Sequence, residues 1–138
     1  MKPVLLDTGP IVALLDASDG FHHACVAAIS EIGVPLVTCE AVVAESCYLL
    51  RRVRGASEAV LENVAAGVFL IPVPLSQSAR EVSRVLQRYA DRKIDLADAC
   101  LVHLANELGI GDILTLDRDF DVYRWGRRNT FRSLMDLQ

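Results

Sequence analysis

The sequence predicts an α/β fold, a three-layer α/β/α sandwich with a central, mainly parallel sheet. Two observations predict it. Short, continuously apolar runs recur along the chain, as expected for strands that are covered on both faces. Segments with helical spacing of apolar residues lie between these runs, and such alternation is typical of a parallel sheet. The 138 residues are the length of one domain, so we expect a single domain over residues 1–138.

Four apolar runs are the expected strands, beginning with Pro-Val-Leu-Leu, which ends at Asp7. In chain order these strands cover residues 3–6, 35–38, 68–73 and 112–116. The arginine-rich segment that follows Arg118 contains one further candidate, a short edge strand over residues 130–134.

The expected helices fill the segments between the strands. In chain order they lie near residues 9–16, 20–32, 39–53, 56–66, 77–90 and 95–108. Gly33, Gly55 and Gly109 stand at expected helix ends, where glycine is common because it adopts left-handed backbone conformations easily.

Composition and charge exclude several classes of protein. Hydrophobic residues make up 52%, which argues against disorder, and no apolar run approaches the roughly 18 residues of a membrane-spanning helix. Asp7 comes too early for a signal peptide, so we expect a cytoplasmic protein. The net charge of −4 disfavours a general polyanion binder. The four cysteines show no C-x-x-C spacing, and we expect reduced thiols rather than a zinc or redox motif.

Four acidic residues are expected at one edge of the sheet. Ligands of an open parallel sheet bind at the carboxyl ends of its strands, and Asp7 and Asp117 each follow a strand. Glu45 lies on an apolar helix face, and Asp98 lies in the first turn of the helix over 95–108. Converging carboxylates repel one another unless a cation lies among them. Hard oxygen ligands without histidine or cysteine suit Mg²⁺ or Mn²⁺.

Each acidic residue also has a purely structural interpretation. Asp7 caps a helix in that case, Asp95 is an N-cap with Asp98 as its partner, and Asp117 and Asp119 are turn residues. Other chemistries lack their motifs, because the chain contains no P-loop, no G-x-G-x-x-G and no G-x-S-x-G. A haloacid-dehalogenase-type phosphatase needs Asp-x-Asp after the first strand, whereas here Thr-Gly follows Asp7.

Four segments in chain order resemble the acidic motifs of PIN-domain ribonucleases. They read LLDTGPIVALLD, VVAES, DLADACLVHLA and LTLDRDFDVY, and they extend from Asp7 to about Tyr123. The resemblance is closest to the VapC toxins of type II toxin–antitoxin pairs. It implies a parallel-sheet α/β/α fold and an endoribonuclease that depends on Mg²⁺ or Mn²⁺. It also implies a small antitoxin partner and products with 5′-phosphate and 3′-hydroxyl ends.

Carried over by position, the resemblance gives catalytic and metal-binding roles to Asp7, Glu45, Asp98 and Asp117. Asp119 is a close rival of Asp117 for the last role, and the metal count stays open. Thr8 matches a hydroxyl residue that often follows the first aspartate, and Thr115 resembles the threonine that usually precedes the fourth acid.

Two surfaces are candidates for binding RNA and protein partners. Arginines recur every four residues on the helix over 77–90, and a second group ends the helix over 39–53; these are Arg80, Arg84, Arg88, Arg51, Arg52 and Arg54. Both groups suit RNA phosphates, and the alternative is a solvated charged face. Apolar residues on the helices over 39–53 and 56–66, namely Val43, Leu50, Val60 and Val64, exceed what one core needs. We expect a homodimer or an antitoxin groove there, unless these helices simply pack on the sheet.

Two other functions stay open at this point. One is an RNA-processing nuclease of the same fold without an antitoxin. The other is a catalytically inactive PIN-like scaffold that binds RNA or protein, which the intact acidic set disfavours.

Overall fold

The computed structural model describes residues 2–135, and within them five parallel strands form one sheet in the order β3-β2-β1-β4-β7. The strands are β1 (Val4–Leu6), β2 (Leu36–Val37), β3 (Phe69–Leu70), β4 (Asp112–Leu114) and β7 (Arg132–Ser133). The central strand β1 is fully buried, and its Leu5 pairs with Val37 on one side and Ile113 on the other. The expected mainly parallel sheet is confirmed.

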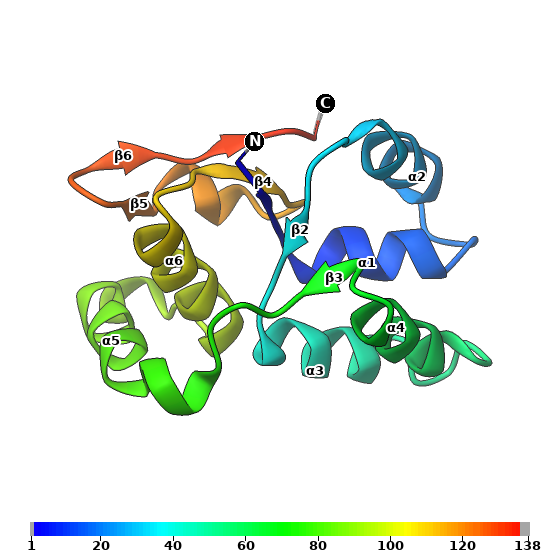
Figure 1. Cartoon of the computed structure of the whole chain (residues 1–138), viewed down its shortest axis with the longest axis horizontal. Coiled ribbons are helices and arrows are strands. Elements are labelled where there is room, and N and C mark those ends of the chain that lie inside the picture. The colour runs from blue at the N-terminus through cyan, green and yellow to red at the C-terminus, as the bar shows by residue number, and fades with distance from the viewer. Residues whose placement is uncertain (1, 136–138) are drawn as a thin grey trace.

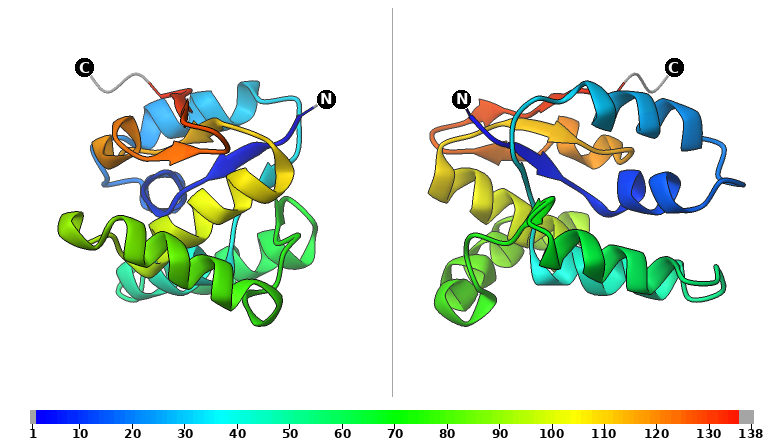
Figure 2. Two further views of the ribbon diagram at one scale, coloured as in Figure 1. Left: turned by 90° about the vertical axis from the view of Figure 1, so that its left-hand side faces the viewer. Right: turned by 45° about the vertical axis from the view of Figure 1, so that its right-hand side comes forward.

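Helices cover both faces of this sheet. They are α1 (Thr8–Leu15), α2 (His22–Glu31), α3 (Glu40–Leu49), α4 (Ala56–Ala65), α5 (Leu75–Arg88) and α6 (Leu96–Leu108). Figures 1 and 2 show α1 and α2 on one side of the strands and α5 and α6 on the other. Helix α3 packs against both α1 and α6. The architecture is therefore the three-layer α/β/α sandwich that the sequence predicts.

Helix α6 is the centre of the helical packing. Every residue from 97 to 105 is buried, and α6 contacts α3, α5 and the strand over Arg124–Trp125. A helix that is buried on all sides is rigidly placed. It ends at Gly109, whose φ of 64° is the left-handed conformation that glycine adopts without strain.

Three expected boundaries were wrong. Helix α3 ends at Leu49 rather than near residue 53, and Gly55, with a φ of 76°, is the N-cap of α4 rather than the end of α3. Strand β3 is shorter than the expected 68–73 run, because Pro72 and Pro74 have no backbone N–H for a ladder. Helix α5 starts at Leu75, directly after Pro74, rather than near residue 77. The N–H of Leu75 donates to Glu40 Oε2 at 3.1 Å.

The carboxyl-terminal segment contains the expected edge strand and an unexpected hairpin. Strand β7 pairs with β4, and Arg132 forms a bidentate ion pair with Asp112 at 2.9 and 2.8 Å. Strands β5 (Arg124–Trp125) and β6 (Asn129–Thr130) form a separate antiparallel hairpin. Its turn uses positive φ angles at Gly126 and Arg128, and arginine carries no sequence signal for that conformation.

The apolar residues that were expected to exceed the core mostly belong to it. Leu50 and Val60 are fully buried, and Val43 and Val64 are partly buried against the core. The expectation of surplus apolar surface at these positions was therefore wrong. The same two helices do expose other apolar side chains, namely Tyr48, Leu49 and Leu61.

Two further expectations concern the membrane and the cysteines. In the part of the chain that the structure describes, no helix is both long enough and apolar enough to cross a membrane. Cys25, Cys39, Cys47 and Cys100 are free thiols, and all except the partly buried Cys47 are buried. The free thiols agree with the expectation of reduced cysteines.

Candidate metal centre

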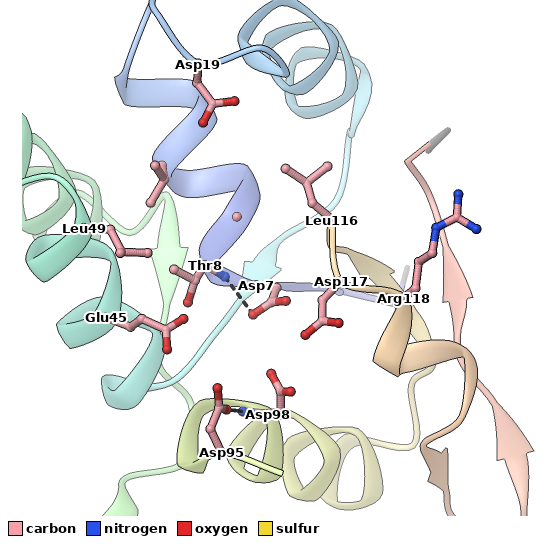
Figure 3. Close-up of a pocket in the computed structure, with 12 residues that line it drawn as sticks. Asp7, Thr8, Asp19, Glu45, Leu49, Asp95, Asp98, Leu116, Asp117 and Arg118 are labelled. Carbon is pink, nitrogen blue, oxygen red and sulfur yellow. Dashed lines mark hydrogen bonds between the residues drawn. The ribbon is translucent and has the colours of Figure 1, made fainter. Parts of the chain in front are cut away.

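Three aspartates from distant parts of the chain meet at the carboxyl edge of the sheet. Asp7 follows β1, Asp117 lies three residues after β4, and Asp98 is in the first turn of α6. One carboxylate oxygen from each of them lies within 4.8 Å of the other two. Figure 3 shows the three side chains facing one another, with Asp98 opposite the other two. The convergence arises because the neighbouring parallel strands β1 and β4 end at the same edge and α6 begins beside them.

Asp7 is held by two hydrogen bonds. Its Oδ1 accepts from the backbone N–H of Thr8 at 2.8 Å, and its Oδ2 accepts from the hydroxyl of Thr115 at 2.7 Å. Only 5% of the residue is exposed, and burial raises the pKa of Asp7 to about 6 in spite of these hydrogen bonds. Asp7 also caps α1, so its helix-capping interpretation holds together with its place in the cluster.

Asp98 carries the largest pKa shift among the three aspartates. Burial, and after it the charges of Asp7, Asp95 and Asp117, raise the pKa of Asp98 to about 8. Asp95 is the N-cap of α6 and accepts from the N–H of Asp98 at 2.8 Å, as the structural interpretation expects. The carboxyl of Asp98 is therefore mostly protonated at neutral pH unless a cation is nearby.

Asp117 and Asp119, the two candidates for the last acidic position, differ in their placement. Asp117 belongs to the cluster, and burial raises its pKa. Asp119 is exposed, donates its N–H to Asp117 Oδ1 at 2.8 Å and pairs with Arg92 at 3.8 Å. Thr115 links both sides of the site, because its hydroxyl also accepts from the N–H of Asp117 at 2.9 Å.

The aspartate cluster opens into a pocket of about 510 Å³. Its lining includes Asp7, Thr8, Gly9, Val12, Asp19, Glu45, Leu49, Asp95, Asp98, Leu116, Asp117 and Arg118. Glu45 reaches this pocket from α3 and is half-buried, but it lies outside the group of three aspartates that approach one another most closely. It is near enough for its charge to raise the pKa of Asp7.

These residues fit a divalent cation of the hard, oxygen-preferring kind. Three carboxylates with raised pKa values face a shared space, and a cation there relieves their repulsion. Thr8 lines the same pocket and is only 4% exposed, and its buried hydroxyl has no hydrogen-bond partner among residues 2–135. An unpartnered buried hydroxyl is costly, and water or a ligand in the pocket would satisfy it.

None of the arginines that were expected to bind RNA lines the acidic pocket. Arg80, Arg84 and Arg88 are exposed on α5, and the last two line a separate cavity with His103 and Asn106. Arg51 and Arg52 are exposed in the turn after α3, as is Arg54. The guanidinium of Arg51 stacks 4.0 Å above the ring of Tyr48. The acidic pocket is lined instead by Arg118, which the sequence analysis did not select.

One buried residue at the site was missed. The hydroxyl of Tyr123 donates to Asp98 Oδ2 at 3.1 Å, and only 1% of Tyr123 is exposed. The two residues are 25 positions apart, and Asp98 lies on α6 whereas Tyr123 lies in the loop before Arg124, so periodicity carries no signal for their contact.

Comparisons with known proteins agree with this geometry. The model of a family described as "PIN domain" matches residues 4–126. The chain is 33% identical to Ribonuclease VapC26 of Mycobacterium tuberculosis (strain ATCC 25618 / H37Rv) over 117 residues, which is 83% of this chain and 87% of that protein. The crystal structure of Mycobacterium tuberculosis VapC20, a sarcin–ricin loop cleaving toxin, is similar with a TM-score of 0.77 and 21% identity. That match covers 86% of this chain and 93% of VapC20.

Proposed function

Because this chain belongs to the PIN-domain family, we propose that it is an endoribonuclease whose cation is held by Asp7, Asp98 and Asp117. The observation that carries the proposal is the approach of the three carboxylate oxygens to within 4.8 Å of one another. Such a site suits Mg²⁺ or Mn²⁺, because the ligands are hard oxygens without histidine or cysteine. The ribonuclease relative VapC26 supports RNA as the substrate class.

Several side chains of the protein have distinct roles around the cation. When bound, the cation supplies Lewis-acid chemistry that lowers the pKa of a water molecule and stabilises negative charge on a phosphate. Thr115 holds Asp7 in place, and Asp95 holds the first turn that carries Asp98. Glu45 faces the pocket from the α3 side, and we assign it to orienting the attacking water or to completing the cation's ligands. Attack by water with departure of the 3′ oxygen, which the resemblance to PIN-domain ribonucleases implies, leaves 5′-phosphate and 3′-hydroxyl ends.

We further propose that the protein is the toxin of a type II toxin–antitoxin pair and acts in the cytoplasm, where its RNA substrate is. The support is the similarity to VapC26 and VapC20. A small antitoxin, or a second copy of the chain, would cover the exposed apolar side chains of Tyr48, Leu49 and Leu61 on α3 and α4. Co-purification with the product of a small neighbouring gene tests the antitoxin, and the mass of the isolated protein in solution tests the homodimer.

Cleavage of RNA by the purified protein tests the proposal. Cellular RNA is incubated with Mg²⁺, Mn²⁺ or a chelator, and new 5′ ends are sequenced. We expect cleavage at defined positions with either cation, none with the chelator, and none by a folded Asp98→Asn variant. Equal cleavage by that variant would refute the assigned site. RNA binding without cleavage by the wild type would instead support the catalytically inactive scaffold.

A further inference from the structure

Tyr123 contacts the metal centre through Asp98 and is not part of the pocket lining. Its phenol donates to Asp98 Oδ2 at 3.1 Å, and the side chain is almost fully buried. A phenol keeps its proton at physiological pH, so this hydroxyl is the donor of the bond. Among the described residues, no other side chain is seen to donate to this carboxylate.

An aromatic cluster fixes the position of the phenol. The ring of Tyr123 makes edge contacts with Tyr89 and Phe120, with centroid separations of 5.0 and 5.1 Å. Phe120 in turn contacts Phe131 at 5.3 Å. Such a ring has little freedom to rotate or shift, because each of its neighbours is held in place as well.

The backbone at and after Tyr123 is also held by hydrogen bonds. The N–H of Tyr123 donates to the carbonyl of Asp119 at 3.2 Å, and the next residue, Arg124, donates its N–H to the hydroxyl of Tyr89 at 3.0 Å. The side chain of Tyr123 joins this segment, and with it the loop of Asp117, to Asp98, whereas the Tyr89 hydroxyl bonds to the backbone beyond Tyr123 and contacts none of the three carboxylates. A shift of this loop would move two of the three carboxylates relative to each other.

We propose that Tyr123 is a positioning residue of the metal centre, whose phenol fixes the orientation of the Asp98 carboxylate and leaves its other oxygen free for the cation. This inference rests on the proposed function for its link to RNA cleavage, but it concerns cation binding in the first place. Hydrogen bonds from neighbouring groups set the orientation and the affinity of metal ligands. Charge-assisted hydrogen bonds of this kind are stronger than neutral ones.

Cation affinity of two matched variants tests the inference. Tyr123→Phe removes only the hydroxyl that donates to Asp98. Tyr89→Phe removes a hydroxyl of the same aromatic cluster, but this hydroxyl accepts from the backbone N–H of Arg124. We expect Tyr123→Phe to weaken Mn²⁺ binding, measured by calorimetry, by roughly 10- to 100-fold, as other such partners do. We expect Tyr89→Phe to bind Mn²⁺ as the wild type does. In RNA cleavage at fixed Mg²⁺, kcat falls in Tyr123→Phe and KM for RNA stays the same.

Three outcomes would overturn the inference: wild-type affinity in Tyr123→Phe, an equal loss in Tyr89→Phe, or no Mn²⁺ binding by the wild type. A second measurement does not depend on how well the variant folds. Titration of the wild type with Mg²⁺ is expected to change tyrosine difference absorption, and an unchanged spectrum would count against the contact. Wild-type protein that binds Mn²⁺ but cleaves no RNA would refute the proposed function alone, since the loss of affinity in Tyr123→Phe would still support the role of Tyr123.

Discussion

The hydroxyl of Thr115 donates a 2.7 Å hydrogen bond to Oδ2 of Asp7, a residue 108 positions away in the sequence. The same hydroxyl accepts from the backbone N–H of Asp117 at 2.9 Å. One side chain, only 1% exposed, therefore joins the aspartate that follows β1 to the loop that carries the aspartate beyond β4.

Loss of the Thr115 hydroxyl is expected to shift the pH dependence of cation binding. The hydrogen bond from Thr115 lowers the pKa of Asp7, so Thr115→Val raises this pKa above its present value of about 6. A larger share of Asp7 is then protonated near neutral pH, and Mn²⁺ affinity at pH 7 falls about tenfold and recovers at higher pH. Calorimetry over a pH series checks this. Thr115→Ser, which keeps the hydroxyl, is the control, and equal shifts in both variants would contradict the explanation.

Without a cation, the cluster is expected to make stability fall as pH rises. Asp98 has a folded-state pKa of about 8 against an ordinary value of 3.8. Between these values the folded protein holds a proton that the unfolded chain has lost, so the free energy of unfolding decreases with pH over this range. The penalty is absent below the lower value and complete above the higher one.

The Asp98→Asn variant removes this titration. At pH 8 without metal, we expect the variant to be more stable than the wild type by at least about 1 kcal/mol, because no carboxyl then has to ionise at this buried position beside other charges. Added Mg²⁺ should stabilise the wild type by mass action and the variant much less. Thermal melting from pH 5 to pH 9, with and without Mg²⁺, checks both statements. A wild-type stability that rises steadily with pH would rule out the proposed ionisation.

Glu45 and Asp119 are expected to behave differently. Glu45 lines the acidic pocket, so Glu45→Gln should slow RNA cleavage by roughly 100-fold or more while weakening Mn²⁺ binding less than Asp98→Asn does. Asp119 is exposed and outside the pocket lining, so Asp119→Asn should keep most of the activity. Single-turnover cleavage and calorimetry on both variants decide this. If Asp119→Asn slowed RNA cleavage more than Glu45→Gln did, Asp119 rather than Glu45 would be the residue that acts in cleavage.

The arginine face of α5 is expected to contact RNA phosphates away from the cation. Replacing Arg80, Arg84 and Arg88 by Gln should weaken RNA binding and flatten the slope of log affinity against log salt by roughly 0.7 per lost contact. Mn²⁺ affinity should stay the same. Filter binding with the inactive Asp98→Asn background measures the slope, and Arg127→Gln on the β5–β6 turn is the control. An unchanged slope would identify the α5 face as a solvated surface.

Much of the architecture follows from patterns that are local in the chain. The apolar run before Asp7 and the helical spacing around Asp98 predicted β1 and α6, and the rule for parallel sheets brought Asp7 and Asp117 to one edge. The sequence could not decide between Asp117 and Asp119, because both follow the same strand. Their difference depends on the 3-10 turn, which leaves Asp117 half-buried in the cluster and Asp119 exposed.

The features that the sequence did not predict depend on tertiary contacts. Tyr123 meets Asp98 only because an aromatic cluster folds the segment after β4 back onto α6. The short α3 and the left-handed Gly55 depend on how α4 packs on α3, which no local pattern encodes. From the sequence, Leu50 and Val60 likewise belong to a set of more apolar residues than one core needs, but in the structure both are buried in the core.

Crystals soaked in MnCl₂ and measured for anomalous scattering test the central claim most directly, because they locate the cation itself. The account predicts an anomalous peak among the carboxylates of Asp7, Asp98 and Asp117 in the wild type, and its loss in Asp98→Asn. A peak elsewhere with these three side chains unoccupied, or an undiminished peak in Asp98→Asn, would contradict it.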